Sequence, residues 1–314
     1  MTKQKPTFSI ITAVYNGEDF IRETVESVLK FAPAGDFEYI VIDDGSLDGT
    51  QEILQEFIQN ICLYRQENSG EAAAVNLGLN NSNGTYAIVV SADDPLISSE
   101  LFALSRSVLD SNSSVMATYP DWYLINKFSK IEREVFTQDF SIRTLVGLNK
   151  CLPGPGAVFR VKQARILGGR NVKLKFGSDF DFWLRLSDLG SFQRIPHLLA
   201  QWRSHENSTS IKLRGPEMAE ERIAIIKNYL TNSEHDEKIY RMAWGSAYYS
   251  AAVLRYFSRE VPHRRYLRQA FVSRKGIPEN LKVREFIYLL TTPVSEFLWL
   301  RIKRAAEQAR SSFL

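Results

Sequence analysis

The adjacent aspartates Asp93 and Asp94 directly follow an apolar run at residues 86–90, where they could do chemistry. Two carboxylates at the end of a buried strand can bind Mg²⁺ or Mn²⁺ through oxygen. The same ion can bridge the phosphates of a nucleotide, because hard cations combine one or two carboxylates with substrate phosphates. A lone Asp-Asp pair is more often an ordinary polar turn, since short motifs match by chance. The rest of the sequence must decide between these interpretations.

A second carboxylate site follows the apolar run at residues 37–42. The sequence over residues 43–50 reads Asp-Asp-Gly-Ser-Leu-Asp-Gly-Thr. Asp44 at a strand end can accept a hydrogen bond from an N–H group of a nucleotide base, and the glycines permit close backbone approach. A surface turn rich in Asp and Gly explains the same composition, so both interpretations stay open.

Both sites need strands to position them, and the hydrophobic pattern predicts these strands. Apolar runs over residues 7–14, 37–42, 61–64 and 85–90 alternate with helical spacing over 21–29, 53–58 and 71–79. Such runs are typical of strands buried on both faces of a parallel sheet. We therefore predict an α/β fold with an open, mostly parallel sheet flanked by helices. Ligands of such sheets bind beyond the carboxyl ends of the strands, where Tyr15, Asp44, Gly70 and Asp93 lie.

The alternation loosens after residue 99 and gives way to helices after residue 215. The first part predicts a helix over 101–109, strands over 115–119, 122–125 and 157–159, an aromatic-rich helix over 180–186 and a closing segment over 198–205. The second part predicts helices over 218–229, 237–257, 264–271, 283–290 and 294–310. We therefore place a domain boundary near residue 212, which gives domains over residues 1–212 and 213–314.

Composition and charge fit a globular chain of 314 residues in which 44% are hydrophobic. The net charge of +3 does not indicate nucleic-acid binding; residues 1–214 carry −3 and residues 215–314 carry +6. The start lacks the pattern of a secretory signal, and the apolar stretch 286–300 is too short to cross a bilayer. We expect a cytoplasmic protein in which Cys62 and Cys151 are buried free thiols.

Five segments resemble, in order and spacing, the family 2 glycosyltransferases of the GT-A fold. The segments are Ile11–Glu18, Val41–Thr50, Asn68–Asn76, Ala92–Pro95 and Gly177–Leu186. The resemblance covers residues 6–210 and implies that a sugar moves from a nucleotide-diphosphate donor, with UDP favoured, to a hydroxyl of a glycan or lipid-linked acceptor. It further implies inversion of the anomeric centre and a place in surface polysaccharide assembly.

The resemblance also implies roles for individual residues. Asp179 matches the general base, and Asp94 matches the ligand of Mn²⁺ or Mg²⁺. Asp93 would lie near the ribose and Asp44 would contact the base. His205 resembles a histidine that approaches the metal or the diphosphate. The other donor-binding positions are Ala13, Val14, Tyr15, Glu18, Gly70 and Asn76.

The chemistry of the transfer agrees with these roles. A divalent ion neutralises the charge of the leaving diphosphate, and a separate carboxylate takes the proton of the acceptor hydroxyl. Three positions depart from the family pattern: Ser178 replaces a glutamate, Val75 an arginine, and Ala13 a proline or threonine. Ser178 and Val75 motivate an alternative function, that of a non-catalytic nucleotide-sugar or glycan binding module. A helix cap at Asp179 and a polyprenyl-phosphate sugar transferase are further alternatives.

Acceptor and membrane contacts follow from aromatic and basic residues. Trp122, Trp183 and the loop that contains Gly156 are candidates for an acceptor pocket, because aromatic faces pack on sugar rings; the tryptophans could equally be core. Basic residues of the C-terminal helices could touch an anionic membrane at its inner face, or could simply be solvated. They are Arg264, Arg265, Arg268, Arg274, Lys275, Arg301, Lys303 and Arg304.

Overall fold

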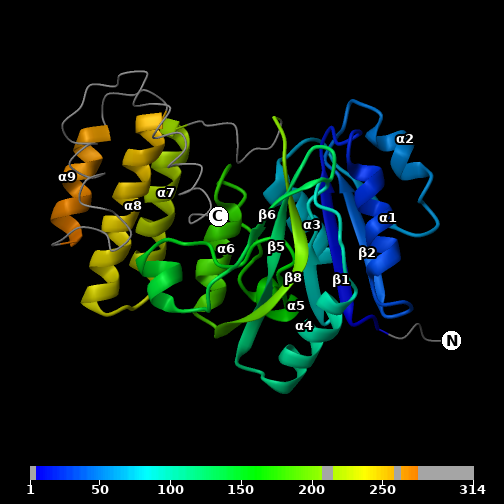
Figure 1. Cartoon of the computed structure of the whole chain (residues 1–314), viewed down its shortest axis with the longest axis horizontal. Coiled ribbons are helices and arrows are strands. Elements are labelled where there is room, and N and C mark those ends of the chain that lie inside the picture. The colour runs from blue at the N-terminus through cyan, green and yellow to red at the C-terminus, as the bar shows by residue number, and fades with distance from the viewer. Residues whose placement is uncertain (1–4, 207–214, 258–262, 275–314) are drawn as a thin grey trace. The chain divides into compact units, whose positions relative to one another are not determined.

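The computed structural model describes residues 5–206, 215–257 and 263–274 (Figure 1). The chain forms two compact units. One comprises Met1–Phe140 and Pro153–Ser208, and the other Ser141–Leu152 and Thr209–Leu314. The boundary predicted near residue 212 and the helices predicted over 283–290 and 294–310 lie outside the described residues.

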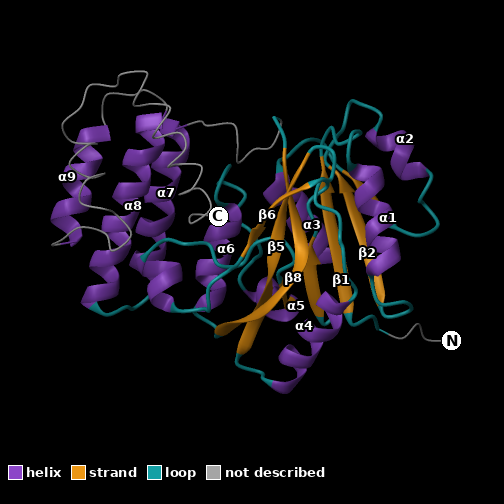
Figure 2. Cartoon of the chain, viewed as in Figure 1, coloured by secondary structure: helices purple, strands orange, loops and turns teal. Residues whose placement is uncertain are grey.

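Eight strands form the sheet of the first unit (Figure 2). They are β1 Phe8–Val14, β2 Phe37–Asp43, β3 Cys62–Arg65, β4 Tyr86–Val89, β5 Val115–Asn126, β6 Ile131–Val135, β7 Val158–Arg160 and β8 Ser191–Ser204. The order is β3-β2-β1-β4-β7-β5-β6, with β8 paired to β5. Strands β1 to β4 pair in parallel, as do β5 and β8, whereas β6 and β7 are antiparallel to their partners. The predicted mostly parallel sheet is confirmed.

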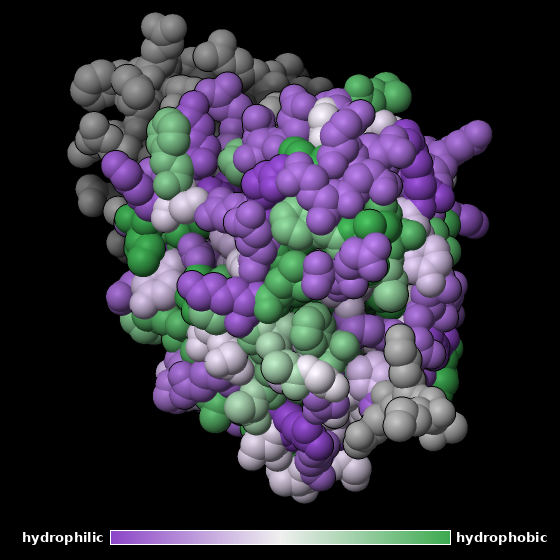
Figure 3. All heavy atoms as spheres, turned by 90° about the vertical axis from the view of Figure 1, so that its right-hand side faces the viewer, coloured by the Kyte–Doolittle hydropathy of each residue, from purple (hydrophilic) through white to green (hydrophobic). Residues whose placement is uncertain are grey.

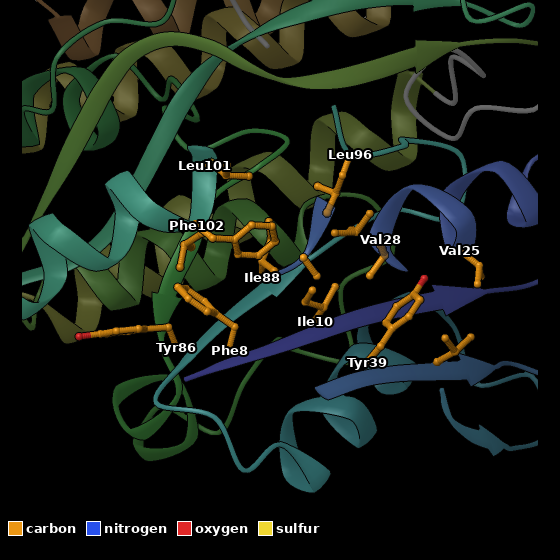
Figure 4. Packing of buried hydrophobic residues seen from close by; sticks show 14 of the residues in the cluster. Phe8, Ile10, Val25, Val28, Tyr39, Tyr86, Ile88, Leu96, Leu101 and Phe102 are labelled. Carbon is orange, nitrogen blue, oxygen red and sulfur yellow. The ribbon is translucent and has the colours of Figure 1, made fainter. Parts of the chain in front are cut away.

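Helices cover both faces of this sheet. They are α1 Ile21–Phe31, α2 Thr50–Gln55, α3 Glu71–Asn81, α4 Glu100–Ser111, α5 Val161–Ile166 and α6 Ser178–Ser187. On one face Val28 of α1 and Phe102 of α4 pack with Ile10 of β1 (Figure 4). On the other, Ala74 of α3 packs against Ile40 of β2. Central strands therefore read as unbroken apolar runs, because both of their faces are buried.

Some strands differ from the sequence prediction. The two strands predicted over 115–119 and 122–125 are one strand, β5, which continues through Pro120 because the pairing with β8 shifts register there. Strand β6 was not predicted, since as an edge strand it exposes most of its side chains. Cys62 is free but exposed, which corrects the expectation of burial, because β3 also lies at an edge.

The second unit is helical in its described part. It contains η1 Arg143–Gly147, α7 Gly215–Asn232, α8 Glu237–Phe257 and α9 His263–Arg274. Ser246 on α8 donates to the carbonyl oxygen of Gly147 at 2.9 Å, and Asn149 donates to the carbonyl oxygen of Ala243 at 2.9 Å. The segment around η1 therefore packs on α8. The C-terminal helical region was predicted; the inclusion of residues 141–152 was not.

The distribution of apolar and hydrophilic residues on the surface does not by itself indicate a function. On the face that carries α1 and α2, apolar residues form separate patches among hydrophilic ones (Figure 3). None of the described helices combines the length and the apolar character that a membrane crossing requires. Of the basic residues suggested as membrane contacts, Lys275, Arg301, Lys303 and Arg304 lie outside the described residues.

Candidate active site

Several of the predicted donor-binding residues lie at or just after the ends of β1, β2 and β4, which run parallel and end on the same side of the sheet. Val14 at the end of β1 pairs with Asp43 at the end of β2, which in turn pairs with Arg65 of β3. The backbone N–H of Asp44 donates to the carbonyl oxygen of Val14 at 2.8 Å. The segments that follow these strands therefore form one set of neighbouring loops.

Asp44 is buried, and its carboxylate folds the loop of residues 66–70. One oxygen, Oδ1, accepts from Gln66 Nε2 at 2.7 Å and from the N–H of Ser69 at 2.9 Å, while Oδ2 accepts from the N–H of Gly70 at 2.9 Å. Gly70 has φ of 88°, a left-handed conformation that favours glycine, and α3 starts after it. Asp44 and Gly70 are thus in contact. The base contact of Asp44 stays a prediction.

Glu18 joins the loops that follow β1 and β2. Its Oε2 accepts from the N–H of Gly49 at 2.7 Å, and its own N–H donates to Oδ2 of Asp48 at 3.1 Å. Burial alone would raise the pKa of Asp48, but hydrogen bonds from Thr50 and Glu18 hold this pKa below its usual range. The other predicted donor residues here are Ala13, half-buried, Val14, buried, and Tyr15, 47% exposed.

Asp93, Asp94 and His205 come together although β8 is distant from β4 in sequence. Oδ1 of Asp94 accepts from the backbone N–H of Arg203 at 2.7 Å, and the backbone oxygen of Asp93 accepts from Arg203 Nε at 2.7 Å. Nε2 of His205 lies 2.8 Å from Oδ2 of Asp93. The side chain of Asp93 is 28% exposed and that of His205 12%, whereas Asp94 is buried. Asp93 and His205 are the more accessible of the three.

Arg203 holds this arrangement and was missed as a functional residue from the sequence. Its side chain is fully buried; Nη2 donates to Oε2 of Glu23 at 2.7 Å and Nη1 to Oγ of Ser129 at 2.9 Å. Its guanidinium carbon lies 4.8 Å from the centre of the Phe20 ring. A buried arginine needs such partners, because an unpaired buried charge is costly. Its place two residues before His205 was the available signal.

The donor atoms of this group suit a divalent ion. Burial, followed by the charge of Asp93, raises the pKa of Asp94 well above its usual range. Carboxylate oxygens and an imidazole nitrogen are ligand types that Mn²⁺ accepts. Across residues 5–206, 215–257 and 263–274, no three His, Cys, Asp or Glu side chains could hold a metal by themselves. A divalent ion at these residues would need further oxygens from its substrate.

Asn76 joins α3 to the loop that precedes α6. Its Nδ2 donates to the carbonyl oxygen of Arg170 at 2.8 Å, and its Oδ1 accepts from the N–H of Arg170 at 2.7 Å. Nη1 of Arg170 donates to Oε1 of Glu71 at 2.6 Å. Val75, where the family pattern has an arginine, is buried. The donor contact predicted for Asn76 stays a prediction.

Asp179 lies in the first turn of α6, one residue after the buried Ser178. Its Oδ1 accepts from the N–H of Phe180 at 2.7 Å, but the N-cap residue is Gly177 and no side chain caps the helix, which is not what the capping alternative expects. Arg185, further along α6, donates to the carbonyl oxygens of residues 167 and 169 at 2.9 and 2.8 Å. Helix α6 and the loop before it are thus held together, which fixes the position of Asp179.

The acceptor candidates differ in their surroundings. Trp122 is 4% exposed, and a Cβ added to Gly154 would stand 3.4 Å from its Nε1, so the loop of residues 153–156 lies on this ring. Gly156 has φ of 79° and is buried. Trp183 is buried among Phe159, Phe182 and Phe192, with ring centres 5.0 to 6.0 Å away. Packing of this kind is what the core alternative for Trp183 expects.

Comparison with known proteins identifies relatives of this chain. Residues 9–162 match glycosyl transferase family 2. Over 221 residues the chain is 30% identical to TuaG of Bacillus subtilis (strain 168), named as a teichuronic acid biosynthesis glycosyltransferase; the alignment covers 67% of this chain and 84% of TuaG. It is 26% identical over 211 residues to a glycosyltransferase of Rickettsia typhi, covering 65% of this chain and 66% of the relative.

Solved structures share the fold. The TM-score is 0.64 with S. aureus TarS 1–349 in complex with UDP-GlcNAc, at 15% identity, covering 90% of this chain and 81% of that one. It is 0.58 with the mannosyltransferase PcManGT of Pyrobaculum calidifontis in complex with GDP-Man and Mn²⁺, at 15% identity, covering 91% and 86%. At these identities the likeness concerns the fold alone, and the predicted GT-A-like fold is confirmed.

Proposed function

This chain belongs to glycosyl transferase family 2, and we propose that it moves a sugar from a nucleotide-diphosphate donor, with UDP favoured, to a hydroxyl of a surface-polymer acceptor. The observation that carries the proposal is the contact of Asp93 with His205, next to Asp94, at the carboxyl edge that also holds Asp44. The name of TuaG and the UDP-GlcNAc bound to TarS support the polymer and the nucleotide.

The donor side of the proposal uses the loops at the ends of β1, β2 and β4. Asp44 and Gly70 would receive the base, because their mutual hydrogen bond fixes the loop that borders α3. Tyr15 offers a half-exposed aromatic face on the neighbouring loop. Glu18 holds the two loops at a fixed separation through Gly49, so that the site is formed before the donor binds.

We assign a divalent ion to the group of Asp93, Asp94 and His205, with Mn²⁺ supported by its presence in PcManGT. When bound, such an ion neutralises the charge that develops on the leaving diphosphate. The side chains of Asp93 and His205 are partly exposed and could reach it, whereas Asp94 is buried. Arg203 holds the backbone of Asp93 in place for this purpose.

Asp179, in the first turn of α6, would take the proton of the acceptor hydroxyl, because a positioned carboxylate can act as a general base. A single displacement by that hydroxyl inverts the anomeric centre. The domain of residues 1–212 would carry all of these steps. The tail from residue 213 contributes none of the residues named.

Donor binding and donor turnover together test this function against the alternatives. The full chain is titrated with UDP and with GDP in the presence of Mn²⁺ while thermal unfolding is followed, because a ligand of the native state raises its apparent stability. UDP-GlcNAc turnover is then measured with acceptor extracts. We expect a larger shift with UDP and detectable turnover. Binding without turnover against any acceptor would favour the binding module, and no shift with either nucleotide would reject the proposal.

A further inference from the structure

Residues 153–178 of the first unit carry a concentration of positive charge. The basic residues of this segment are Arg160, Lys162, Arg165, Arg170, Lys173 and Lys175, and the segment has no Asp or Glu. Acidic residues make up 36 of 314 in the chain, so about three would be expected here. The net charge of +6 equals that of the entire stretch 215–314. A stretch of positive charge without acidic residues therefore lies immediately before Asp179.

Two of these cations serve the fold. Arg160 donates through Nη2 to the carbonyl oxygen of Leu109 at 2.6 Å, at the end of α4. Arg165 donates through Nη2 to the carbonyl oxygen of Leu79 at 2.8 Å, at the end of α3. The last carbonyl groups of a helix lack partners within it, and arginine side chains satisfy them here. Ligand binding is not needed to explain these two residues.

Three other cations lie within six consecutive residues of the loop between α5 and α6. Arg170 is paired with Glu71 and is held by its backbone to α3. Lys173 and Lys175 are exposed, and the N–H of Lys173 donates to Oδ1 of Asn171 at 3.1 Å. The loop between α5 and α6 contains no acidic residue of its own. Such a surface attracts anions.

The position of the two lysines relates them to the acceptor rather than to the donor. Glu71, which follows Gly70, already compensates Arg170 at the end of the loop nearer to the predicted base pocket. Lys175 lies four residues before Asp179, so the Cα atoms of the two residues are at most about 14 Å apart. An anionic group at Lys175 can therefore belong to the same molecule whose hydroxyl reaches Asp179.

We propose that residues 171–177 bind an anionic group of the acceptor through Lys173 and Lys175, and that the acceptor is an acidic glycan or polyol polymer. A phosphodiester and a uronate both carry a suitable negative charge. The inference rests on the proposed function, because it takes Asp179 as the residue that the acceptor hydroxyl approaches. It adds an acceptor class and two residues that recognise it.

Gel retardation by immobilised polymers tests the inference without knowledge of the natural acceptor. The full chain is run through gels that contain polyglycerol phosphate, polygalacturonate or neutral dextran. We expect retardation by one or both anionic polymers and none by dextran; the stronger of the two identifies the anion. The double variant Lys173→Glu/Lys175→Glu should bind about tenfold more weakly. The control Lys127→Glu/Lys130→Glu makes the same charge change on the exposed turn between β5 and β6 and should retain binding.

Several outcomes would overturn the inference. They are no retardation of the unmodified chain, an equal loss in the control variant, and lysine-dependent binding to phosphatidylglycerol vesicles in place of the polymers. A smaller thermal shift with UDP in the Lys173/Lys175 variant would assign these cations to the donor. If UDP gives no shift even with the unmodified chain, the proposed function fails, while the polymer result still reports on the loop.

Discussion

Nε2 of His205 lies 2.8 Å from Oδ2 of Asp93, although the two residues are 112 positions apart. The contact forms because β8 returns alongside β5 and ends beside the loop that follows β4. The Phe20 ring, with its centre 4.7 Å from that of the imidazole, limits the positions that His205 can take. An imidazole held in this way can share a divalent ion with the aspartate or orient that aspartate toward it.

Replacement of His205 tests this role. We expect His205→Asn to raise the Mn²⁺ concentration needed for half-maximal UDP-sugar turnover about 10-fold to 100-fold, the usual cost of a lost ligand or ligand-orienting group. His197→Asn is the matched control, since His197 is exposed on the same strand. Turnover at several Mn²⁺ concentrations is the measurement, and an unchanged requirement would remove His205 from the metal site.

Loss of the Arg203 guanidinium should destabilise the protein. Arg203→Met leaves the backbone oxygen of Asp93 without its donor and Glu23 without its cation, and we expect about 3 kcal/mol less free energy of unfolding. Arg22→Met is the control, because the Arg22–Glu56 pair is exposed and should matter little. Urea unfolding of both variants gives the comparison. Equal stabilities would show that the buried network contributes nothing.

The position of Asp44 and Asp93 at the carboxyl edge of the sheet could be predicted from the sequence, because physical rules link this position to the hydrophobic pattern of the strands. Strands covered on both faces must be largely apolar, and parallel strands end at the same edge of the sheet. The sequence alone therefore predicts that Asp44 and Asp93 lie at one edge. The Asp93–His205 contact was not predicted: the motifs assigned His205 to the metal or diphosphate and Asp93 to the ribose. Its geometry depends on the register of β5 and β8, which contains shifts that no local pattern encodes.

Other features could not be predicted, for different reasons. An arginine such as Arg203 normally indicates a surface, and its burial depends on Glu23, 180 positions earlier in the chain. Strand β6 is an exposed edge, so no apolar run marks it. The positive charge of residues 153–178 does not show in the net charge of −3 for residues 1–214, because acidic residues elsewhere in that range cancel it.

Asp179→Asn tests the general base. The amide cannot accept a proton but has nearly the same shape, so we expect UDP-sugar transfer to fall about 10²-fold to 10⁴-fold while the UDP thermal shift is unchanged. The helix-cap alternative expects the opposite pattern, with lower thermal stability and retained transfer. Measuring transfer and unfolding on one preparation separates the two, and full activity of the variant would reject the base assignment.

The raised pKa of Asp94 predicts how stability depends on pH. Because the native state binds this proton more tightly than the unfolded chain, the contribution of Asp94 is present at acid pH and is lost as the pH rises through the native pKa. We expect the urea midpoint to fall more from about pH 5 to about pH 8 in the unmodified chain than in Asp94→Asn. Parallel pH profiles of the two proteins would contradict the shift.

Two neighbouring glycines allow a matched test of the link between α3 and the loop before α6. Gly168 and Gly169 have φ of 74° and 71°, so alanine is strained by a similar amount at both. A Cβ at Gly168 meets nothing within 4 Å, whereas one at Gly169 would stand 2.2 Å from Oδ1 of Asn76, the atom that accepts from the N–H of Arg170. The two variants therefore differ in this clash.

Gly168→Ala should cost about 1–2 kcal/mol of unfolding free energy, the price of a left-handed residue alone. Gly169→Ala should cost more, by about 1–3 kcal/mol for the displaced and unsatisfied Asn76 amide. Because the same loop leads to Asp179, sugar transfer should fall further in Gly169→Ala than in Gly168→Ala when both are assayed well below their unfolding temperatures. Equal stability and equal transfer would mean that Asn76 yields freely and that its bonds to Arg170 do not position the loop.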